Sequence, residues 1–299
     1  MKIAIAGGSG FVGNALTTFY LNQGHDVYIL TRNNRKKVHH PNLSYVQWLT
    51  PSCKPEDSLE NLDVFVNLAG ESINSGRWND ERKRQIRESR IKASREVFAI
   101  LSKLKAKPPL LINASAIGFY GTSLDNTFNE QTFQSGTDFL AETVHDWEQE
   151  AVKVEKLGMR VALLRFGIIL GNDGALSRMV LPYRFFIGGT IGTGKQWLSW
   201  IHIDDVIRTV DFVATHEMDG PINVSSPNPK KMKEFGQTIS TVLKRPHWLP
   251  VPQSILKLVL GEMSILVLDG QKVLPSKLLE SGFTFTYENL EEALRDILT

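Results

Sequence analysis

Glycines stand at positions 7, 8, 10 and 13, and their spacing fits both Gly8-x-Gly10-x-x-Gly13 and Gly7-x-x-Gly10-x-x-Gly13. Glycine permits backbone angles that a Cβ atom would forbid, and its small size lets a phosphate approach Gly10 and a helix pack closely at Gly13. An apolar run, residues 3–6, precedes the glycines, and an apolar segment, residues 11–21, follows them. Strand, tight turn and helix in this order predict a dinucleotide site with its phosphates at the helix N-terminus. The alternative is a tight turn that binds no ligand.

No acid occurs from position 27 through position 37, a stretch that begins with the second apolar run. An acid at the end of this run would bind the ribose 2′-hydroxyl of NAD and repel the 2′-phosphate of NADP. Arginine suits a phosphate because its planar guanidinium stays charged and can donate two parallel hydrogen bonds. We therefore predict NADP(H) rather than NAD(H), with Arg32 on the 2′-phosphate and Thr31 beside it. For Arg35, Lys36 and Lys37 the sequence favours a solvated basic turn.

Strands and helices alternate through the first two-thirds of the chain, which predicts an α/β fold with a doubly wound parallel sheet of the Rossmann type. The predicted strands are residues 3–6, 27–30, 44–48, 64–67, 110–114 and 160–166. The predicted helices are residues 11–22, 80–104 and 138–157, the last with Asp138 as N-cap and Gly158 as its stop. Ligands bind such sheets at the carboxyl ends of the strands, where Asn67 to Gly70, Ser115 and Phe166-Gly167 fall.

The alternation weakens after about residue 170, where glycines and prolines become frequent. We expect an NADP-binding Rossmann domain in about residues 1–170 plus about 200–220, and a smaller C-terminal, substrate-side domain in about 171–199 and 221–299. The glycine-rich loop Gly188 to Gly194 and the nearby tryptophans favour a retained pocket. Trp197 and Trp200 are candidates for an aromatic wall of that pocket, and core packing is the alternative.

Length and composition exclude several classes of protein. The chain has 299 residues, is 42% hydrophobic and has a formal net charge of +2, so it can bury a large core and has no strong field for nucleic acid or an anionic membrane. Cys53 is the only cysteine, which excludes an intramolecular disulfide and a multi-cysteine metal site. No run approaches the ~20 apolar residues of a spanning helix. We expect a cytoplasmic protein without signal peptide or metal, with a small-molecule substrate.

Many short motifs together give the chain a resemblance to a known family. They are Gly7 to Gly13, Asn67 to Glu71, Arg77-Trp78, Ser89-Arg90, Ala114 to Gly121, Phe139 to Ala141, Trp147-Glu148, Leu164 to Gly171, Gly192 to Trp197, Trp200 to Asp205 and Asn223 to Pro229. With them the chain resembles the extended short-chain dehydrogenase/reductases, and more closely their atypical branch labelled "epimerase family protein", to which the human short-chain dehydrogenase/reductase family 39U member 1 belongs. The tail, Gly270 to Pro275 with Gly282-Phe283, resembles the small C-terminal domain of that branch.

The resemblance implies an NADP-binding Rossmann fold with oxidoreductase or epimerase activity, and a homodimer formed through two helices of each subunit. The cofactor contacts that it implies are Gly7, Gly10, Phe11, Val12, Gly13, Thr31, Arg32, Leu68, Ala69, Gly70 and Arg90. For Arg90 two interpretations stay open: it reaches a cofactor phosphate, or it is a cation on a helix surface.

The catalytic residues of the family are only partly present. Family members use a serine, which Ser115 matches, and a Tyr-x-x-x-Lys pair on the following helix that transfers a proton. Phe139 and Thr143 stand where this Tyr and Lys are expected, and Phe139 cannot carry a proton, nor Thr143 supply the cation. Another group must therefore handle the proton, or the protein does no ordinary dehydrogenase chemistry.

Nearby residues offer substitutes for the missing pair. Tyr120 follows Ser115 by a few residues, and we predict these two as the catalytic residues. Glu71 follows a strand end, with a solvated loop carboxylate as the alternative. His202, Asp204 and Asp205 look like part of a triad, but Asp205 is expected to cap a helix that begins at Val206.

Two functions follow from these residues. The first is an NADP(H)-dependent oxidoreductase or epimerase that acts on a small carbonyl or hydroxyl substrate, including a nucleotide sugar. The second is a non-catalytic NADP(H)-binding sensor or scaffold that kept the fold and lost the catalytic pair. Fold alone does not decide between them.

Overall fold

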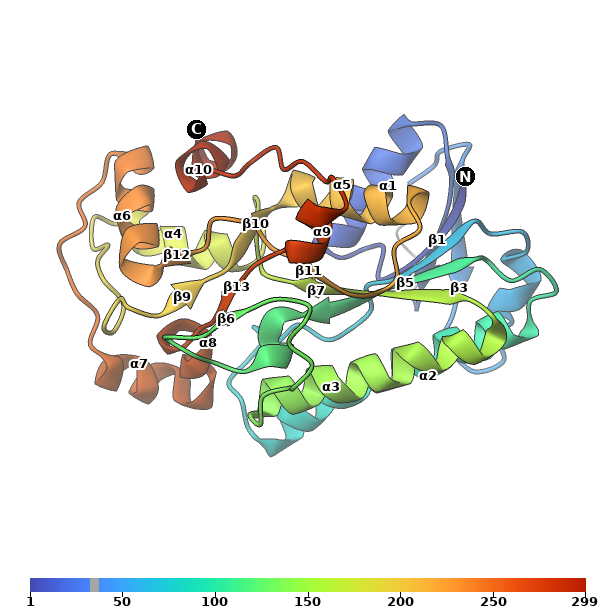
Figure 1. The fold of residues 1–299 in the computed structure, drawn as a ribbon, viewed down its shortest axis with the longest axis horizontal. Helices are drawn as coiled ribbons and strands as arrows, with labels where there is room; N and C mark the ends of the chain where they lie inside the picture. Colours follow the sequence, from blue (N-terminus) through green and yellow to red (C-terminus); the bar gives the residue numbers. More distant parts are fainter. Residues whose placement is uncertain (33–37) are drawn as a thin grey trace.

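Seven parallel strands form the central sheet in the computed structural model, which describes residues 1–32 and 38–299 (Figure 1). The strand order is β11-β7-β5-β4-β1-β2-β3. Their bounds are β1 Lys2–Ala6, β2 Asp26–Thr31, β3 Leu43–Gln47, β4 Val64–Asn67, β5 Leu110–Ala116, β7 Arg160–Phe166 and β11 Gly220–Val224. The predicted doubly wound Rossmann fold is confirmed, and the order reverses between β1 and β4, where such sheets bind ligands.

Strand β11 is the one strand of this sheet that the sequence did not predict. Its segment begins Gly220-Pro221, and both residues weaken a strand pattern. Proline is tolerated here because β11 lies at the edge of the sheet. The strand begins where the sequence placed a boundary near residue 220. The division into a Rossmann domain and a smaller domain stays a prediction.

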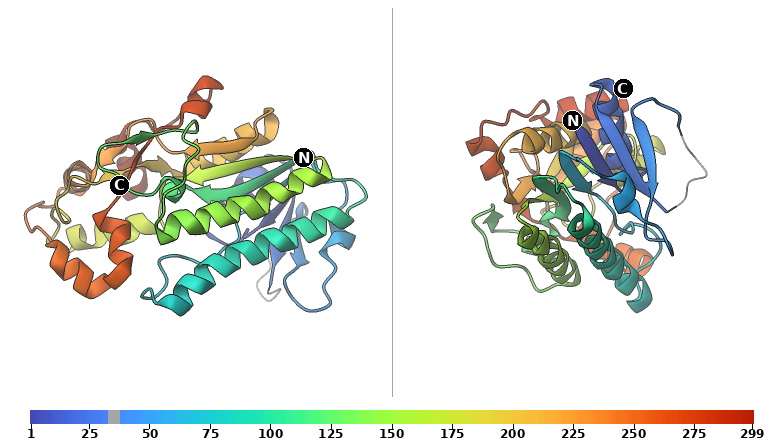
Figure 2. Two further views of the ribbon diagram at one scale, coloured as in Figure 1. Left: turned by 60° about the horizontal axis from the view of Figure 1, so that its bottom comes forward. Right: turned by 90° about the vertical axis from the view of Figure 1, so that its right-hand side faces the viewer.

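Helices cover both faces of the sheet (Figures 1 and 2). Helices α1 (Phe11–Asn22) and α5 (Ile203–Thr215) share one core with Ile3 and Ile5 of β1. Helix α2 (Asp80–Lys103) and the 3-10 helix η3 (Val152–Leu157), which continues α3 (Phe139–Ala151), share the opposite core with Ala4 and Ala6. Alternate side chains of a strand point to opposite faces, so an apolar run becomes a strand buried on both sides.

Side-chain caps set the ends of α3 and α5. The Asp138 carboxylate accepts the N–H groups of Leu140 and Ala141 at the start of α3, and Gly158 ends η3 with a φ of 80°, as predicted. Helix α5 begins at Ile203, with His202 as its N-cap, so the expected start at Val206 was wrong. Asp205 was also wrongly assigned as the cap.

Asp205 instead anchors the C-terminal segment of the chain. It is fully buried, and its two carboxylate oxygens accept the N–H groups of Thr286 and Tyr287 at 2.8 and 2.9 Å. Arg208 donates to the same carboxylate at 2.9 Å. Hydrogen bonds to a charged group are stronger than those between neutral groups, so this carboxylate ties the tail firmly to α5.

A further core lies beyond the carboxyl ends of the strands. It joins α4 (Ala175–Arg184), α6 (Met232–Leu243) and α10 (Leu290–Leu298). Helices α7 (Gln253–Leu260) and α8 (Ile265–Leu268), joined by the 3-10 helix η4 (Gly261–Ser264), pack against residues around Trp78 and Phe139. The remaining short elements are η1 Pro55–Ser58, η2 Ile117–Tyr120, β6 Thr127–Phe128, β8 Ile168–Leu170, β9 Trp197–Leu198, β10 Trp200–His202, β12 Lys230–Lys231, β13 Lys272–Val273 and α9 Ser276–Glu280. None of the described helices is long and apolar enough to cross a membrane.

Candidate functional site

The glycine turn after β1 forms a tight cradle at the N-terminus of α1. Gly7 has a φ of 81°, and a Cβ atom there would lie 2.8 Å from the Leu68 carbonyl group. A Cβ atom on Gly13 would lie 2.3 Å from the Gly7 oxygen, which shows the expected close packing of helix and strand. The N-cap residue of α1, Gly10, supplies no side-chain hydrogen bond, so N–H groups of the first helical turn remain for a ligand. These residues fit a dinucleotide phosphate.

Thr31 and Arg32 lie at the carboxyl end of β2, beside this cradle. Arg32 is exposed, and within residues 1–32 and 38–299 it has no hydrogen bond or ion pair. Its guanidinium is thus available to an added phosphate. The predicted basic turn at Arg35, Lys36 and Lys37 lies outside the described residues.

Two buried asparagines join the ends of β4 and β5. The Asn67 amide donates to the Asn113 side chain at 2.7 Å, and the Asn67 oxygen accepts the Ala69 N–H at 3.2 Å. This fixes the path of Leu68 and Ala69 under the glycine cradle, since Leu68 also donates its N–H to Ala6. A rigid strand end therefore precedes the three residues that are predicted to contact the cofactor here, Leu68, Ala69 and Gly70.

Arg90 lies against Gly70, because a Cβ atom on Gly70 would be 3.2 Å from the Arg90 Cγ. Its Nη1 donates to the carbonyl groups of Glu71 and Ile86, and its guanidinium carbon is 5.1 Å from the Trp147 ring centroid. Burial lowers the pKa of Arg90 to about 10, although the charge of Glu71 partly opposes this shift. No described carboxylate forms an ion pair with it. Arg90 is a half-buried cation that an anionic ligand would stabilise.

A cavity of about 450 Å³ opens at the carboxyl ends of β5 and β7. Phe11 and Arg90 line it on the cofactor side, and Ser115 lines it from the end of β5. Residues 265, 266 and 269–271 line it from the C-terminal segment of the chain, so the sheet and this segment both contribute to its wall. The cradle and the cavity share α1, which places a dinucleotide and a second ligand within reach of each other.

The structure adds Glu148 and Arg165 to the site, beside Ser115. The Ser115 Oγ lies 2.5 Å from the Glu148 Oε1, and Arg165 donates from Nε and Nη2 to the two oxygens of Glu148, each at 2.8 Å. All three side chains are buried. The sequence reasoning missed this pair. The available signal was Arg165 within a buried strand, because a buried charge requires a partner.

The Tyr120 hydroxyl lies on the far side of Arg165 from Glu148. It accepts from the Arg165 Nη1 at 3.0 Å and donates to the Asn223 side chain at 2.8 Å. Burial raises the pKa of Tyr120, with a partial opposing effect from Arg165. Tyr120 does not line the cavity, whereas Ser115 does. Only one of the two residues predicted to be catalytic therefore lines the cavity.

The positions of the missing Tyr and Lys differ in their surroundings. Phe139 packs edge-on against Trp78, with ring centroids 5.3 Å apart. Thr143 lines the cavity, one helical turn before Trp147. The Thr143 hydroxyl and the Trp147 indole N–H are buried and have no hydrogen-bond partner in the described structure. Each unpaired group costs about 1–3 kcal/mol, so a bound ligand that approached them would recover free energy.

The other suggested substitutes lie away from the cavity. Glu71 lies beside a separate hollow of about 730 Å³ on the exposed face of α2, and its carboxylate is 3.7 Å from the Arg82 guanidinium. That hollow is lined mainly by charged and polar side chains, and it does not include the glycine cradle. We therefore place the functional site at the smaller cavity.

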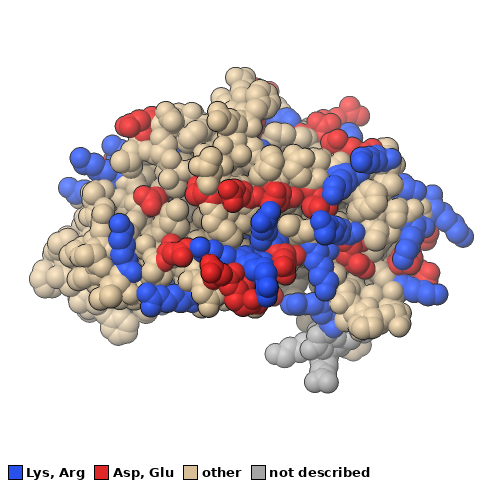
Figure 3. Space-filling view, turned by 90° about the horizontal axis from the view of Figure 1, so that it is seen from below, with Lys and Arg blue, Asp and Glu red and all other residues tan. Residues whose placement is uncertain are grey.

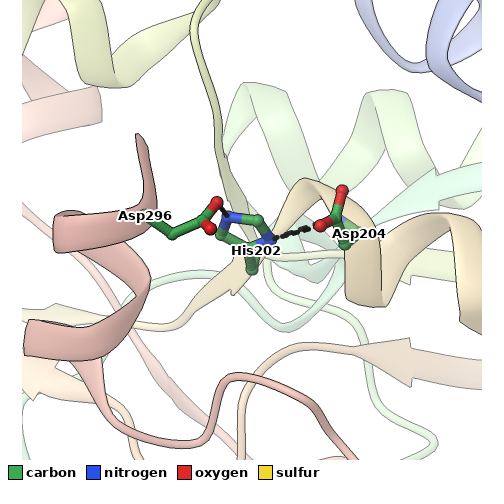
Figure 4. A group of neighbouring side chains, drawn as sticks. All are labelled: His202, Asp204 and Asp296. Carbon is green, nitrogen blue, oxygen red and sulfur yellow. Dashed lines mark hydrogen bonds and ion pairs between the residues drawn. The ribbon is translucent and has the colours of Figure 1, made fainter. Parts of the chain in front are cut away.

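His202 and its acidic neighbours form a structural cluster (Figure 4). The His202 Nδ1 accepts the Asp204 N–H, and the Nε2 lies 3.3 Å from the Asp296 carboxylate of α10. Figure 4 shows the two carboxylates on opposite sides of the ring, and one ligand atom from each of the three residues lies within 4.8 Å of the others, close enough for a metal ion. Both carboxylates are exposed, and exposed acidic groups commonly lie this close without an ion. Burial lowers the pKa of His202, although the charges of Asp204, Asp296 and Asp205 oppose this shift. The cluster anchors α10 to α5.

The two tryptophans have different surroundings. Trp197 lines the cavity, which agrees with an aromatic wall, whereas Trp200 is fully buried in the core with α4 and α6. The loop Gly188 to Gly194 does not line the cavity, so its use as a sign of the pocket was wrong. That loop packs against residues 247–251 instead, and a Cβ atom on Gly189 would lie 1.9 Å from the Leu249 oxygen.

Comparison with known proteins places this site in a family. A model described as "NAD dependent epimerase/dehydratase family" matches residues 3–225. The chain belongs to this family. A domain of unknown function, DUF1731, matches residues 251–297, which confirms the predicted epimerase branch with its C-terminal domain.

Relatives of this epimerase family match the whole chain. The epimerase family protein YfhF of Bacillus subtilis is 50% identical over 299 residues, covering 100% of this chain and 98% of that protein. The crystal structure of human epimerase family protein SDR39U1 with NADPH has a TM-score of 0.87 and 29% identity, and covers 99% of both chains. MoeE5 in complex with UDP-glucuronic acid and NAD has a TM-score of 0.79 at 19% identity, covering 98% and 96% of the two chains. This last similarity shows the fold alone.

Proposed function

We propose that the protein is an NADP(H)-dependent oxidoreductase or epimerase that acts on a small carbonyl or hydroxyl substrate, with a nucleotide sugar among the candidate classes. The observation that carries the proposal is the cavity, whose lining includes Phe11 next to the glycine cradle and Ser115 at the end of β5. A bound nicotinamide would supply or accept hydride there. Gly7, Gly10, Phe11, Val12 and Gly13 would hold the pyrophosphate, and Ser115 would orient the substrate oxygen. Tyr120 would influence it only through Arg165 and Glu148.

Several observations support NADP(H) as the cofactor. Arg32 is exposed at the end of β2 and has no partner among the described residues, as a 2′-phosphate site requires. The human relative SDR39U1 binds NADPH, whereas MoeE5 binds NAD. Arg90, Leu68, Ala69 and Gly70 would complete the cofactor site, and Thr31 would lie beside Arg32.

Thermal unfolding with each cofactor tests the proposal. A ligand at 100 times its dissociation constant adds about 2.7 kcal/mol to the free energy of unfolding. We expect NADPH to raise the melting temperature clearly more than NADH at equal concentration. NADPH oxidation is then followed with panels of carbonyl compounds and nucleotide sugars. The absence of any shift with either cofactor would contradict the proposal.

A second candidate is a non-catalytic NADP(H)-binding sensor or scaffold. It is supported by Phe139 and Thr143, which leave no ionisable side chain in the place of the Tyr and Lys. Stabilisation by NADPH without turnover of any alcohol, ketone or sugar nucleotide would favour this candidate.

The assembly and location of the protein also remain predictions. Figure 3 shows acidic and basic side chains interleaved over the face that α2 and α3 form. Ion pairs within the chain, such as Arg87 with Asp146 and Arg95 with Glu150, occupy part of this face. A homodimer through these helices would therefore have a polar interface, and we expect light scattering to show its dissociation as salt is added. A cytoplasmic location is the prediction from composition.

A further inference from the structure

The hydroxyl group of Ser115 already donates its proton in a hydrogen bond within the protein. An ionised carboxylate only accepts hydrogen bonds, and a guanidinium only donates them. Glu148 therefore accepts from Arg165 and from Ser115, and the 2.5 Å distance between the Ser115 Oγ and the Glu148 Oε1 is that of a charge-assisted hydrogen bond. Ser115 must be the donor in this contact. Its lone pairs are what it can offer to the cavity.

Arg165 holds this arrangement in place. It binds both oxygens of Glu148 at 2.8 Å, and its guanidinium carbon lies 3.6 Å from the Phe119 ring centroid. Burial opposes the charge on Arg165, but its contacts with Glu148 and Tyr120 together outweigh burial and raise the pKa of Arg165. Removing one partner of such a buried pair leaves an uncompensated charge, so the two charges persist together. The direction of the Ser115 hydrogen bond is thus fixed by its neighbours.

The walls of the cavity around Ser115 are mainly apolar. They include Ile117, Leu140, Val144, Ile168, Ile265 and Leu266. Arg90 is the only Lys or Arg among the described residues that line the cavity, and it lies on the cofactor side, against Gly70. Lys231 and Lys272 contact the Trp197 ring but are not part of the lining. A diphosphate favours several cations or N–H donors, and Arg90 is the single described cation of this wall.

We propose that the cavity selects a compact, largely apolar secondary alcohol whose hydroxyl group donates a hydrogen bond to Ser115. The inference rests on the proposed function and narrows its substrate class. A carbonyl oxygen has no proton, so it would meet the Ser115 lone pairs without a hydrogen bond between them. A hydroxyl group of the same shape would make that bond. Glu148 and Arg165 are the positioning residues that create this preference.

Matched pairs of alcohol and ketone test the inference by binding alone. The probes are cyclohexanol with cyclohexanone and 1-phenylethanol with acetophenone, titrated into protein saturated with tetrahydro-NADPH, which has no hydride to transfer. We expect each alcohol to bind about tenfold more tightly than its ketone, the difference of one hydrogen bond. Calorimetry or ligand-observed NMR measures both constants. UDP-glucose should not displace cyclohexanol.

Two variants separate the hydrogen bond from general damage to the fold. S115A keeps the Glu148–Arg165 pair, and we expect it to bind alcohol and ketone equally. S102A removes an exposed hydroxyl on α2 and should keep the tenfold preference. We expect E148Q to weaken the preference for alcohol over ketone, because the side-chain amide of glutamine can donate a hydrogen bond to the Ser115 Oγ.

Four results would overturn the inference while leaving the proposed function intact. Two concern the preference: the unmodified protein binds the ketones as tightly as the alcohols or more tightly, or S115A keeps the preference for the alcohol. The other two are displacement of cyclohexanol by UDP-glucose and no binding of any probe to the cofactor-loaded protein. Failure of tetrahydro-NADPH and NADPH to bind would instead contradict the proposed function.

Discussion

Arg165 shows how strongly one residue can depend on its partners. It lies in β7, a buried strand, where an unpaired charge would be prohibitively unfavourable. Glu148 from α3 neutralises it, and Tyr120 and Ser115 complete the hydrogen bonds around the pair. A polar network of this kind fixes the orientation of every group in it. The cavity therefore meets a Ser115 side chain whose rotation is restricted.

Arg32 carries the prediction on cofactor choice. Changing Arg32→Glu replaces a cation by an anion where a 2′-phosphate would bind, so we expect NADPH affinity to fall by at least tenfold and NADH affinity to change little. Fluorescence titration of both cofactors measures this. Arg84→Glu, on the exposed face of α2, is the matched charge control. Equal weakening of both cofactors by Arg32→Glu would remove Arg32 from the cofactor site.

At the residue scale, the sequence allows a prediction where local chemistry is decisive. The glycines and Arg32 were predicted to bind the cofactor because backbone approach and charge at one position determine such a use, and their cofactor contacts stay predictions. Glu148 could not be assigned, since its partners Ser115 and Arg165 come from different strands and only the folded sheet brings them together. Tyr120 was predicted from its closeness to Ser115 in sequence, but its hydroxyl points to Asn223 instead.

Among the elements, the contact between α5 and α10 depends on pH through His202. Asp204 and Asp205 of α5, Asp296 of α10 and the Tyr287 ring, whose centroid lies 3.9 Å from that of His202, surround the imidazole. Burial lowers the pKa of His202 below its usual 6.5 in the folded protein. The unfolded chain then binds more protons than the folded one below about pH 6.5. This group therefore makes the protein less stable as the pH falls through that range.

The variant His202→Asn tests this pH dependence. Asparagine is a good N-cap, so we expect only a modest loss of unfolding free energy at pH 7.5, about 1 kcal/mol. Between pH 7.5 and 5.5 the variant should lose less stability than the unmodified protein. Urea unfolding at the two pH values measures the difference, with His39→Asn, an exposed site, as control. Identical losses in both proteins would mean that His202 does not contribute.

Elements were predictable where the apolar pattern was long and uniform. The six predicted strands, which are β1 to β5 and β7, and helix α1 follow the sequence closely, because buried parallel strands are apolar on both sides. The start of α5 was placed too late, since the cap is His202 rather than one of the two acids that follow it. Strand β11 was missed because its stability comes from pairing with β7 and not from its own residues.

On the scale of the whole molecule, the cavity lies where the Rossmann sheet meets the C-terminal segment. The glycine cradle belongs to the sheet, while Leu266 of α8 belongs to the opposite wall. Leu266→Trp should therefore narrow the cavity and weaken binding of cyclohexanol by about tenfold or more, while the dissociation constant of NADPH changes less than about threefold. Titrations of both ligands provide the measurement.

A control for this variant is Leu279→Trp on α9, where the leucine is exposed. It adds the same side chain away from the cavity, and both ligands should bind as before. Parallel loss of cofactor and alcohol binding in Leu266→Trp would show that the two walls do not act separately.

The outer edge of β11 also affects how the protein behaves at high concentration. Backbone N–H groups alternate sides along a strand, so Pro221 and Asn223 face the same way. Asn223 donates its N–H to the Glu130 carboxylate at 2.9 Å, and Pro221 has no N–H to donate. Neither position can therefore donate an N–H group to a strand of a neighbouring molecule. The β11 edge of the sheet is thus protected against edge-to-edge aggregation.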